Sequence, residues 1–86
     1  MAPLQIGFFR TADDVTVAGV AHADGSWSVG MGLDVIGEGK EESVIFAVCA
    51  AARCLHRAHA NAYRTYRCMG PISWSVITLT PPEGEA

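Results

Sequence analysis

Hydrophobic and polar residues alternate along the first part of the chain, and the spacing later changes to steps of three and four. Leu4 to Arg10, Val15 to Ala23 and Trp27 to Ile36 each have the alternation and composition of a β-strand. Asp24-Gly25 lies between the second and third segments, and this dipeptide favours a two-residue hairpin turn. The pattern therefore predicts three successive strands, of which the last two form a β-hairpin.

A two-residue turn at Asp24-Gly25 also fixes the pairing of those two strands. The predicted pairs are His22 with Trp27, Val20 with Val29, Ala18 with Met31 and Thr16 with Leu33. This register gives the hairpin one largely apolar face. The opposite face carries small side chains and the glycines Gly19, Gly30 and Gly32.

The segment from Glu41 to Asn61 has the pattern of one long helix. Its apolar positions are separated by alternating steps of four and three: Val44, Val48, Ala51, Leu55, Ala58 and Ala62. Gly37-Glu38-Gly39 is expected to end the preceding strand. Glu38, Glu41 and Glu42 are then expected at the helix N-terminus, where the helix dipole favours negative charge. Another face of the helix carries Arg53, Arg57, Asn61 and Arg64.

The segment after the helix is shorter and less regular. Tyr63 to Met69 fits either a helix end or a short strand, and Gly70-Pro71 indicates a turn. Ile72 to Thr80 is predicted to be a final strand, followed by a tail over residues 81–86. The fold class is therefore α+β, with a single domain over residues 1–86. The expected order is β-β-β-α-β, with one long helix packed on one face of an antiparallel sheet of about four strands.

The composition limits the size of the core and also indicates a cellular compartment. The chain has 86 residues, and much of its 50% hydrophobic fraction is alanine, so we consider a homodimer as one way to bury more apolar surface. The N-terminus lacks the pattern of a signal peptide, and no apolar stretch reaches the roughly 20 residues of a membrane span. Three cysteines without paired spacing favour a reducing compartment. We therefore expect a cytoplasmic protein without a membrane partner.

Charge is divided unevenly along the chain, although the net charge is only −3. Seven of the nine acidic residues lie between Asp13 and Glu42, and the segment from Ser43 to Pro82 has none. That segment contains the basic and aromatic residues Arg53, Arg57, Arg64, Arg67, Tyr63 and Tyr66. Arginine contacts phosphate and tyrosine stacks on bases, so a nucleic-acid surface is one interpretation. Against it, the isoelectric point is about 5.4, and positive charge near a helix C-terminus is also explained by the helix dipole.

Other residues were considered for metal, phosphate or catalytic chemistry. Cys49, His56 and His59 lie along one helical stripe, so zinc binding is an alternative, but the spacing of neither His22 nor Cys68 supports a fourth ligand. Gly37 and Gly39 before a helix suggest a phosphate loop only weakly, because the fuller motifs are absent. The sequence offers no Ser-His-Asp, Cys-His or paired-carboxylate arrangement. We therefore expect a non-enzymatic protein with no catalytic residues, no metal site and no cofactor.

From Ala18 to Leu55 the order of a hairpin, a Gly-x-Gly and an alanine-rich helix resembles part of a double-stranded-RNA-binding domain. The similar residues are Gly37, Gly39, Ala50, Ala51, Ala52 and Leu55. In that family, lysines at the start of the helix bind RNA, and this chain has Glu41, Glu42 and Ser43 in that region. The same order is similar to antitoxin domains with a partial ribonuclease-H-like fold, and to small phage-encoded inhibitors of the anti-CRISPR type. These resemblances imply a scaffold and not an activity.

The leading hypothesis is a non-enzymatic protein–protein interaction module, an inhibitor or regulator that docks on a larger protein or nucleoprotein complex. Its expected contact residues are Arg53, Arg57, Arg64, Arg67, Tyr63, Tyr66 and Trp27, since arginine and aromatic residues are enriched at interface hot spots. Nucleic-acid binding through the Arg-rich end of the helix is the second hypothesis, and zinc binding is the third.

Overall fold

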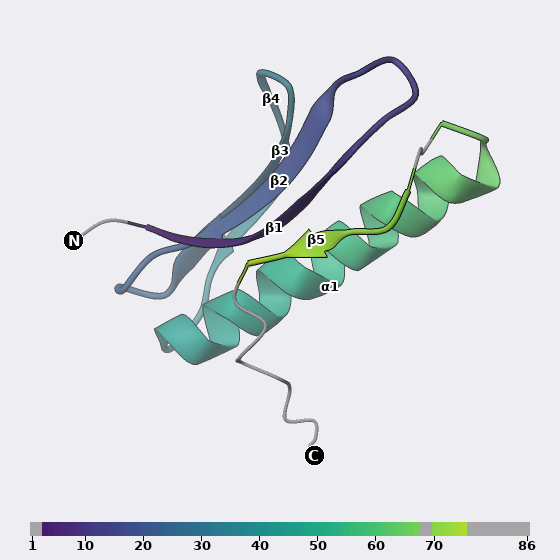
Figure 1. The fold of residues 1–86 in the computed structure, drawn as a ribbon. Coiled ribbons are helices and arrows are strands. Elements are labelled where there is room, and N and C mark those ends of the chain that lie inside the picture. The colour runs from purple at the N-terminus through teal and green to yellow at the C-terminus, as the bar shows by residue number, and fades with distance from the viewer. Residues whose placement is uncertain (1–2, 68–69, 76–86) are drawn as a thin grey trace.

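The fold is a five-stranded antiparallel sheet with one long helix packed on one face, as the computed structural model describes it over residues 3–67 and 70–75 (Figure 1). The strands run in the order β4-β3-β2-β1-β5 across the sheet. The elements are β1 (Leu4–Arg10), β2 (Thr16–Ala21), β3 (Ser26–Met31), β4 (Asp34–Lys40), α1 (Val44–Arg64) and β5 (Ser73–Trp74). The predicted α+β class is confirmed, with one more strand before the helix than the pattern suggested.

The core forms between α1 and the sheet face that it covers. The sheet contributes Ile6, Phe9, Val17, Ala21 and Val29, and the helix contributes Ala47, Val48, Ala51 and Leu55. The predicted apolar stripe is therefore the buried face of the helix, with Val44, Ala58 and Ala62 packed at its margin. Small alanine side chains let the helix lie close to the strands, which suits a chain with few large apolar residues.

The helix begins at Val44, three residues later than predicted. Ser43 is its N-cap, and the hydroxyl of Ser43 accepts a hydrogen bond from the Phe46 amide. Glu41 and Glu42 precede the helix, Glu38 belongs to β4, and the first helical turn contains no acidic residue. Glu41 and Glu42 therefore lie just before the helix and not in its first turn, because the chain becomes helical only after Ser43, which caps one of the free amides.

The pairing of β2 with β3 differs from the prediction by one residue. Val20 lies opposite Ser28, and Val29 lies opposite Gly19. The turn has three residues: the His22 amide donates to the Ser26 carbonyl, and Gly25 adopts a φ of +92°. A glycine with positive φ at the end of such a loop is the usual three-residue hairpin turn. The slip places Gly19 on the helix-facing side and Gly30 on the other, so the predicted glycine-lined face does not exist.

A short hydrogen-bonded cluster stabilises this turn. The carboxylate of Asp24 accepts hydrogen bonds from the Ser26 hydroxyl at 2.7 Å and the Ser26 amide at 3.0 Å. These bonds, with a smaller contribution from Lys40, lower the pKa of Asp24 to about 2.

We expect the contribution of Asp24 to stability to depend on pH. A carboxyl whose pKa is lower in the folded state stabilises the fold above its unfolded pKa, and this stabilisation is lost as pH falls from about 4 to about 2. Asp24→Asn should therefore unfold more easily than the wild type at pH 7 and equally easily at pH 2, as followed by urea denaturation. A difference that stays constant across this range would contradict the assignment.

The segment predicted as a third strand is two strands joined by a tight turn. Gly32 and Leu33 connect β3 to β4, and Gly32 has a φ of +63°. Glycine at the first central position is typical of a type II′ hairpin turn. Farther along β4, Ile36 forms a bulge, because Val29 pairs with Gly37 while Gly30 pairs with Val35.

The Gly37-Glu38-Gly39 segment continues β4 and does not end the strand, contrary to the prediction. A Cβ atom at Gly37 would lie 2.4 Å from Cys54 Sγ, and one at Gly39 would lie 2.8 Å from Trp27 Nε1. The two glycines therefore leave room for the Trp27 indole and for the helix above β4. Gly37 and Gly39 lie within a strand and not in a loop before the helix, so the phosphate-loop interpretation is excluded.

Past the helix, the chain returns to the sheet edge beside β1. Gly7 of β1 pairs with Trp74 of β5. The strand β5 lies in the described part of the predicted strand from Ile72 to Thr80. Of the ambiguous segment after Asn61, Tyr63 and Arg64 belong to the helix and Thr65 to Arg67 form its end. Residues 68–69, the remainder of the last predicted strand from 76 onward and the expected tail lie outside the described residues.

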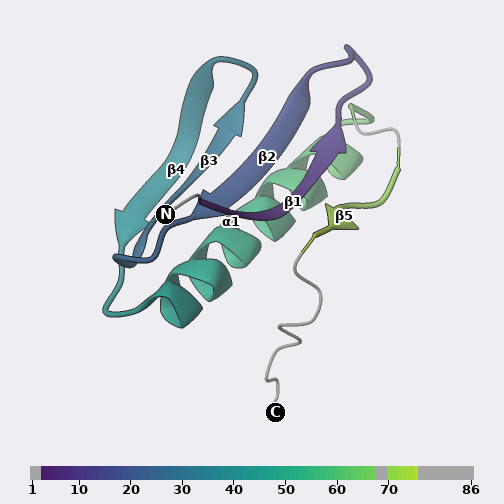
Figure 2. The ribbon, with the colours of Figure 1, turned by 60° about the vertical axis from the view of Figure 1, so that its left-hand side comes forward.

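The sheet face away from the helix is not covered by another element of the described chain (Figure 2). One row across this face consists of Val35, Gly30, Ala18, Phe8 and Ser73. Within residues 3–67 and 70–75, no helix has both the length and the hydropathy needed to span a membrane.

Candidate interaction surface

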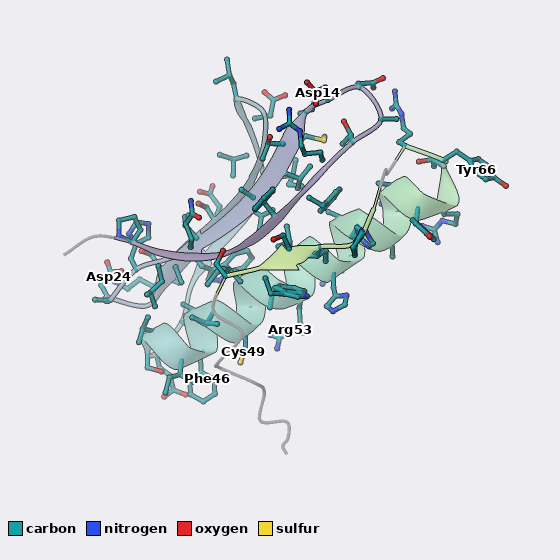
Figure 3. The ribbon with its side chains drawn as sticks, viewed as in Figure 1. Asp14, Asp24, Phe46, Cys49, Arg53 and Tyr66 are labelled. Atoms are coloured by element: carbon teal, nitrogen blue, oxygen red, sulfur yellow. The ribbon has the colours of Figure 1, made fainter. Side chains whose placement is uncertain are left out.

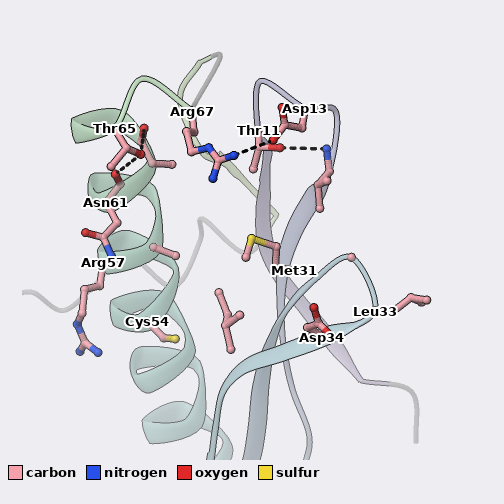
Figure 4. Close-up of a pocket in the computed structure, with 15 residues that line it drawn as sticks. Thr11, Asp13, Met31, Leu33, Asp34, Cys54, Arg57, Asn61, Thr65 and Arg67 are labelled. Atoms are coloured by element: carbon pink, nitrogen blue, oxygen red, sulfur yellow. Dashed lines mark hydrogen bonds and ion pairs between the residues drawn. The ribbon is translucent and has the colours of Figure 1, made fainter.

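A groove separates the β3–β4 hairpin from the C-terminal half of α1 (Figure 4). It has a volume of about 1100 Å³ and is open to solvent. Its apolar lining comes from β-strands, turns and the helix, and consists of Val15, Met31, Leu33, Ile36, Cys54, Ala58 and Ala62. The apolar residues that the helix contributes to this lining, Cys54, Ala58 and Ala62, are all small.

Polar residues surround this apolar lining and differ in charge between the two sides. Arg57 lies on the helix side, and Asp34 lies on the hairpin side. Among the residues that the structure describes, neither takes part in an ion pair. At one end of the groove, Arg67 pairs with Asp13 at 3.3 Å, so that pair connects the end of the helix to the β1–β2 turn.

The end of α1 is a compact hydrogen-bonded cap. The Arg67 amide donates to the Ala62 carbonyl at 2.7 Å, and the Tyr66 amide donates to the Tyr63 carbonyl at 3.2 Å. These two bonds define a Schellman motif, in which the residue at the position of Tyr66 is usually glycine. Tyr66 has a φ of +58°, which L-residues adopt at a cost. Its side chain is 90% exposed and extends away from the helix end (Figure 3).

Two further predicted residues lie beside this cap. Tyr63 is 64% exposed, and its ring stacks on His59 with 5.6 Å between the ring centroids. The guanidinium of Arg64 donates to the Asn61 side-chain oxygen. The structure therefore brings Tyr63, Arg64, Tyr66 and Arg67 together at one end of the molecule, which we call the aromatic–arginine end.

The other predicted contact residues lie elsewhere. Arg53 is on the outward side of α1, near Cys49 and about three turns before Arg64 (Figure 3). Arg57 is one turn farther along, on the side of the groove. Trp27 is half-buried against the core, and its indole Nε1 donates to the Glu41 carboxylate at 3.1 Å. Trp27 is thus separate from the arginines and connects β3 to the segment before the helix.

The residues of the zinc hypothesis have other contacts. His59 Nε2 lies 2.7 Å from the Gly70 carbonyl oxygen, and the His59 ring meets the Phe9 ring edge-on. The His56 ring lies against Trp74. Over residues 3–67 and 70–75, no three His, Cys, Asp or Glu side chains are grouped as metal ligands. Cys68, one of the considered fourth ligands, lies outside this range.

Comparison with known proteins gives no family to which the chain can be assigned. No protein-family model, no curated protein and no solved structure matches it.

The hairpin side of the groove was not predicted from the sequence. Met31, Leu33, Asp34 and Ile36 were assigned to one long strand from Trp27 to Ile36, in which a turn with exposed side chains was not expected. Gly32 between Met31 and Leu33 was the available signal, since glycine at the first position of a two-residue loop permits a type II′ turn.

Proposed function

We propose that this chain is a small non-enzymatic interaction module that docks on a larger protein or nucleoprotein complex through the aromatic–arginine end, and thereby regulates or inhibits it. The observation that carries this proposal is the position of Tyr66. An exposed aromatic side chain occupies a left-handed position where glycine would be more stable. Backbone strain of this kind is concentrated at functional sites, and a contact with a partner gives a reason for it.

The neighbouring side chains support the same interpretation. Tyrosine and arginine are enriched among the residues that contribute most to protein interfaces. Here Tyr63 is stacked on His59, Arg64 is bonded to Asn61, and Arg67 is paired with Asp13. Contacts that restrict side chains before binding reduce the entropy lost on association. The aromatic–arginine end therefore has both the composition and the partial ordering of a binding surface.

Nucleic-acid binding is the second candidate, and one feature favours it. The helix contains no acidic residue over its 21 positions, whereas Arg53, Arg57 and Arg64 are all exposed on it. Binding to a phosphate backbone would weaken steeply with added salt, because bound cations are released from the nucleic acid. A titration of RNA and DNA at two salt concentrations therefore separates this function from protein docking.

Replacing Tyr66 with glycine should make the protein more stable. We expect the free energy of unfolding to rise by about 0.5–1 kcal/mol, because glycine adopts positive φ without the steric cost of a Cβ atom. The matched control is Tyr63→Gly, one residue before the last helical position, which should lower stability by about 1 kcal/mol. Urea denaturation of both variants measures the two effects. A Tyr66→Gly variant less stable than the wild type would contradict the strain argument.

Tyr66→Gly also tests docking. Because this variant is expected to be more stable than the wild type, a loss of binding would not result from misfolding. The immobilised wild-type chain should retain one stoichiometric partner from a lysate of the source cells, and Tyr66→Gly should lose it. Phe46→Ala is the control, since Phe46 is an exposed aromatic residue at the other end of the same helix. Equal retention by Tyr66→Gly, or no stoichiometric partner for the wild type, would overturn the proposal.

A further inference from the structure

The β3–β4 hairpin ends in a group of exposed apolar side chains. Leu33 at its tip is fully exposed, and Val35 is 60% exposed, with Met31 and Ile36 exposed beside them. Isolated exposed apolar residues are common on protein surfaces, but these four lie within six consecutive residues. The hairpin is therefore an apolar projection from the domain.

The same hairpin is one wall of the groove described above. Met31, Leu33 and Ile36 contribute to its lining, and α1 contributes the facing wall with Cys54 and Ala58. One molecule thus carries an apolar projection directly beside an apolar groove (Figure 4). A surface with both features can be complementary to a copy of itself.

The charges on the two sides of the groove are also complementary between two copies of the chain. Arg57 lies on the helix side and Asp34 lies on the hairpin side. Rotation about a two-fold axis that runs along the groove places the helix side of one copy against the hairpin side of the other. Each arginine then faces an aspartate, and the same surface patch is used twice, as a two-fold symmetric interface requires.

We infer that the groove is filled by a second copy of this chain, with the hairpin of each copy packed against α1 of the other and Arg57 paired with Asp34 of the partner subunit. The contact would remove the groove-lining side chains Met31, Leu33 and Ile36 of each chain from water, which favours association. Arg67 lies at one end of the groove, but Tyr63, Arg64 and Tyr66 do not line it, so the dimer would still present these three residues of each aromatic–arginine end. This inference does not depend on the proposed docking function.

Sedimentation equilibrium of the full chain tests the inference. We expect a mass of twice the 9.1 kDa of one chain at micromolar concentration. Leu33→Asp should weaken the dimer by roughly 30-fold, as loss of a central apolar contact does. Ile45→Asp is the control, because it places the same charge at an exposed apolar position outside the groove. A monomer at all concentrations, or a dimer that Leu33→Asp leaves unchanged, would overturn the inference.

A charge exchange tests the orientation of the two copies. Arg57→Asp alone and Asp34→Arg alone should each weaken the dimer by about tenfold, because each places like charges opposite one another. The double variant should regain most of the lost affinity. Both residues are exposed, so circular dichroism should show an unchanged fold in all three variants. A double variant no more dimeric than the single variants would exclude this pairing.

Discussion

Replacement of Gly25 with alanine is expected to lower the free energy of unfolding by about 3 kcal/mol. Positive φ costs an L-residue about 1–2 kcal/mol, and overpacking costs a further 1–3 kcal/mol. Both apply here, because Gly25 has a φ of +92° and a Cβ atom would lie 2.2 Å from the Glu41 carbonyl oxygen. For 86 residues, total stability is expected at about 4–13 kcal/mol, so this loss is large.

The close contact between Gly25 and Glu41 joins the turn to the segment before the helix. A second variant at position 25 separates the effect of this contact from the effect of the φ angle. The Glu41 amide donates to the Gly25 carbonyl at 2.8 Å, so the β2–β3 turn holds the segment that leads into α1. Asparagine tolerates positive φ better than alanine, yet it also carries a Cβ atom. We therefore expect Gly25→Asn to be almost as destabilised as Gly25→Ala when both are measured by urea denaturation.

The control for this pair is Ala23→Ser, an exposed position in the same turn, which should change stability by less than about 0.5 kcal/mol. If Gly25→Asn retained wild-type stability, the φ angle alone would explain the glycine. The close contact with Glu41 would then not be a reason why glycine is needed at position 25.

The helix could be predicted from the sequence because its signal is local and repeated. Val48, Ala51 and Leu55 are three of several positions that specify the same buried face, so an error at one position does not change the result. The start was misplaced because Glu41 and Glu42 are compatible with a first turn by charge. The decisive feature was the Ser43 hydroxyl, which caps the Phe46 amide.

The hairpin register could not be read from Asp24-Gly25 alone. This dipeptide suits a two-residue turn, and it suits equally a three-residue turn that ends in a left-handed glycine. The choice between them depends on which residues the helix covers. In the folded chain, Val17, Ala21 and Val29 share the helix-facing side. A difference of one residue in the turn reverses every side chain of a strand.

The candidate surfaces were predictable to different degrees. Tyr63, Arg64, Tyr66 and Arg67 are close in sequence, and a helix end keeps them close in space. The strained position of Tyr66 was not predictable, because the residue at that position is usually glycine and tyrosine gives no such signal. The groove depends on the turn at Gly32 and on its distance from α1, and both are properties of the tertiary structure.

Trp27 has a structural role that its residue type alone did not indicate. An aromatic residue near a hairpin tip was interpreted as a contact for a partner, and Gly37-Glu38-Gly39 was interpreted as the end of a strand. The structure connects the two segments: Trp27 lies opposite Gly39 in the β3–β4 pairing, and its indole occupies the space that the glycines leave. Glycine in a strand often marks such a close approach.

Gly39→Ala is therefore expected to displace the Trp27 indole and to destabilise the protein by about 2 kcal/mol. The added Cβ atom would lie 2.8–3.2 Å from three atoms of a rigid ring, and the displacement would also break the hydrogen bond from Nε1 to Glu41. In a Trp74→Phe background, the fluorescence of Trp27 should shift to longer wavelength as the ring becomes more exposed.

A double-mutant cycle with Trp27→Phe isolates the cause of this destabilisation. Phenylalanine lacks the second ring and the N–H group that a Cβ atom at position 39 would meet, so Gly39→Ala should cost clearly less in the Trp27→Phe protein. Glu38→Ala is the control, since Glu38 lies between the two glycines on β4 and its side chain is exposed. Additive effects of the two substitutions would show that the glycine at position 39 is needed for the strand and not for the indole.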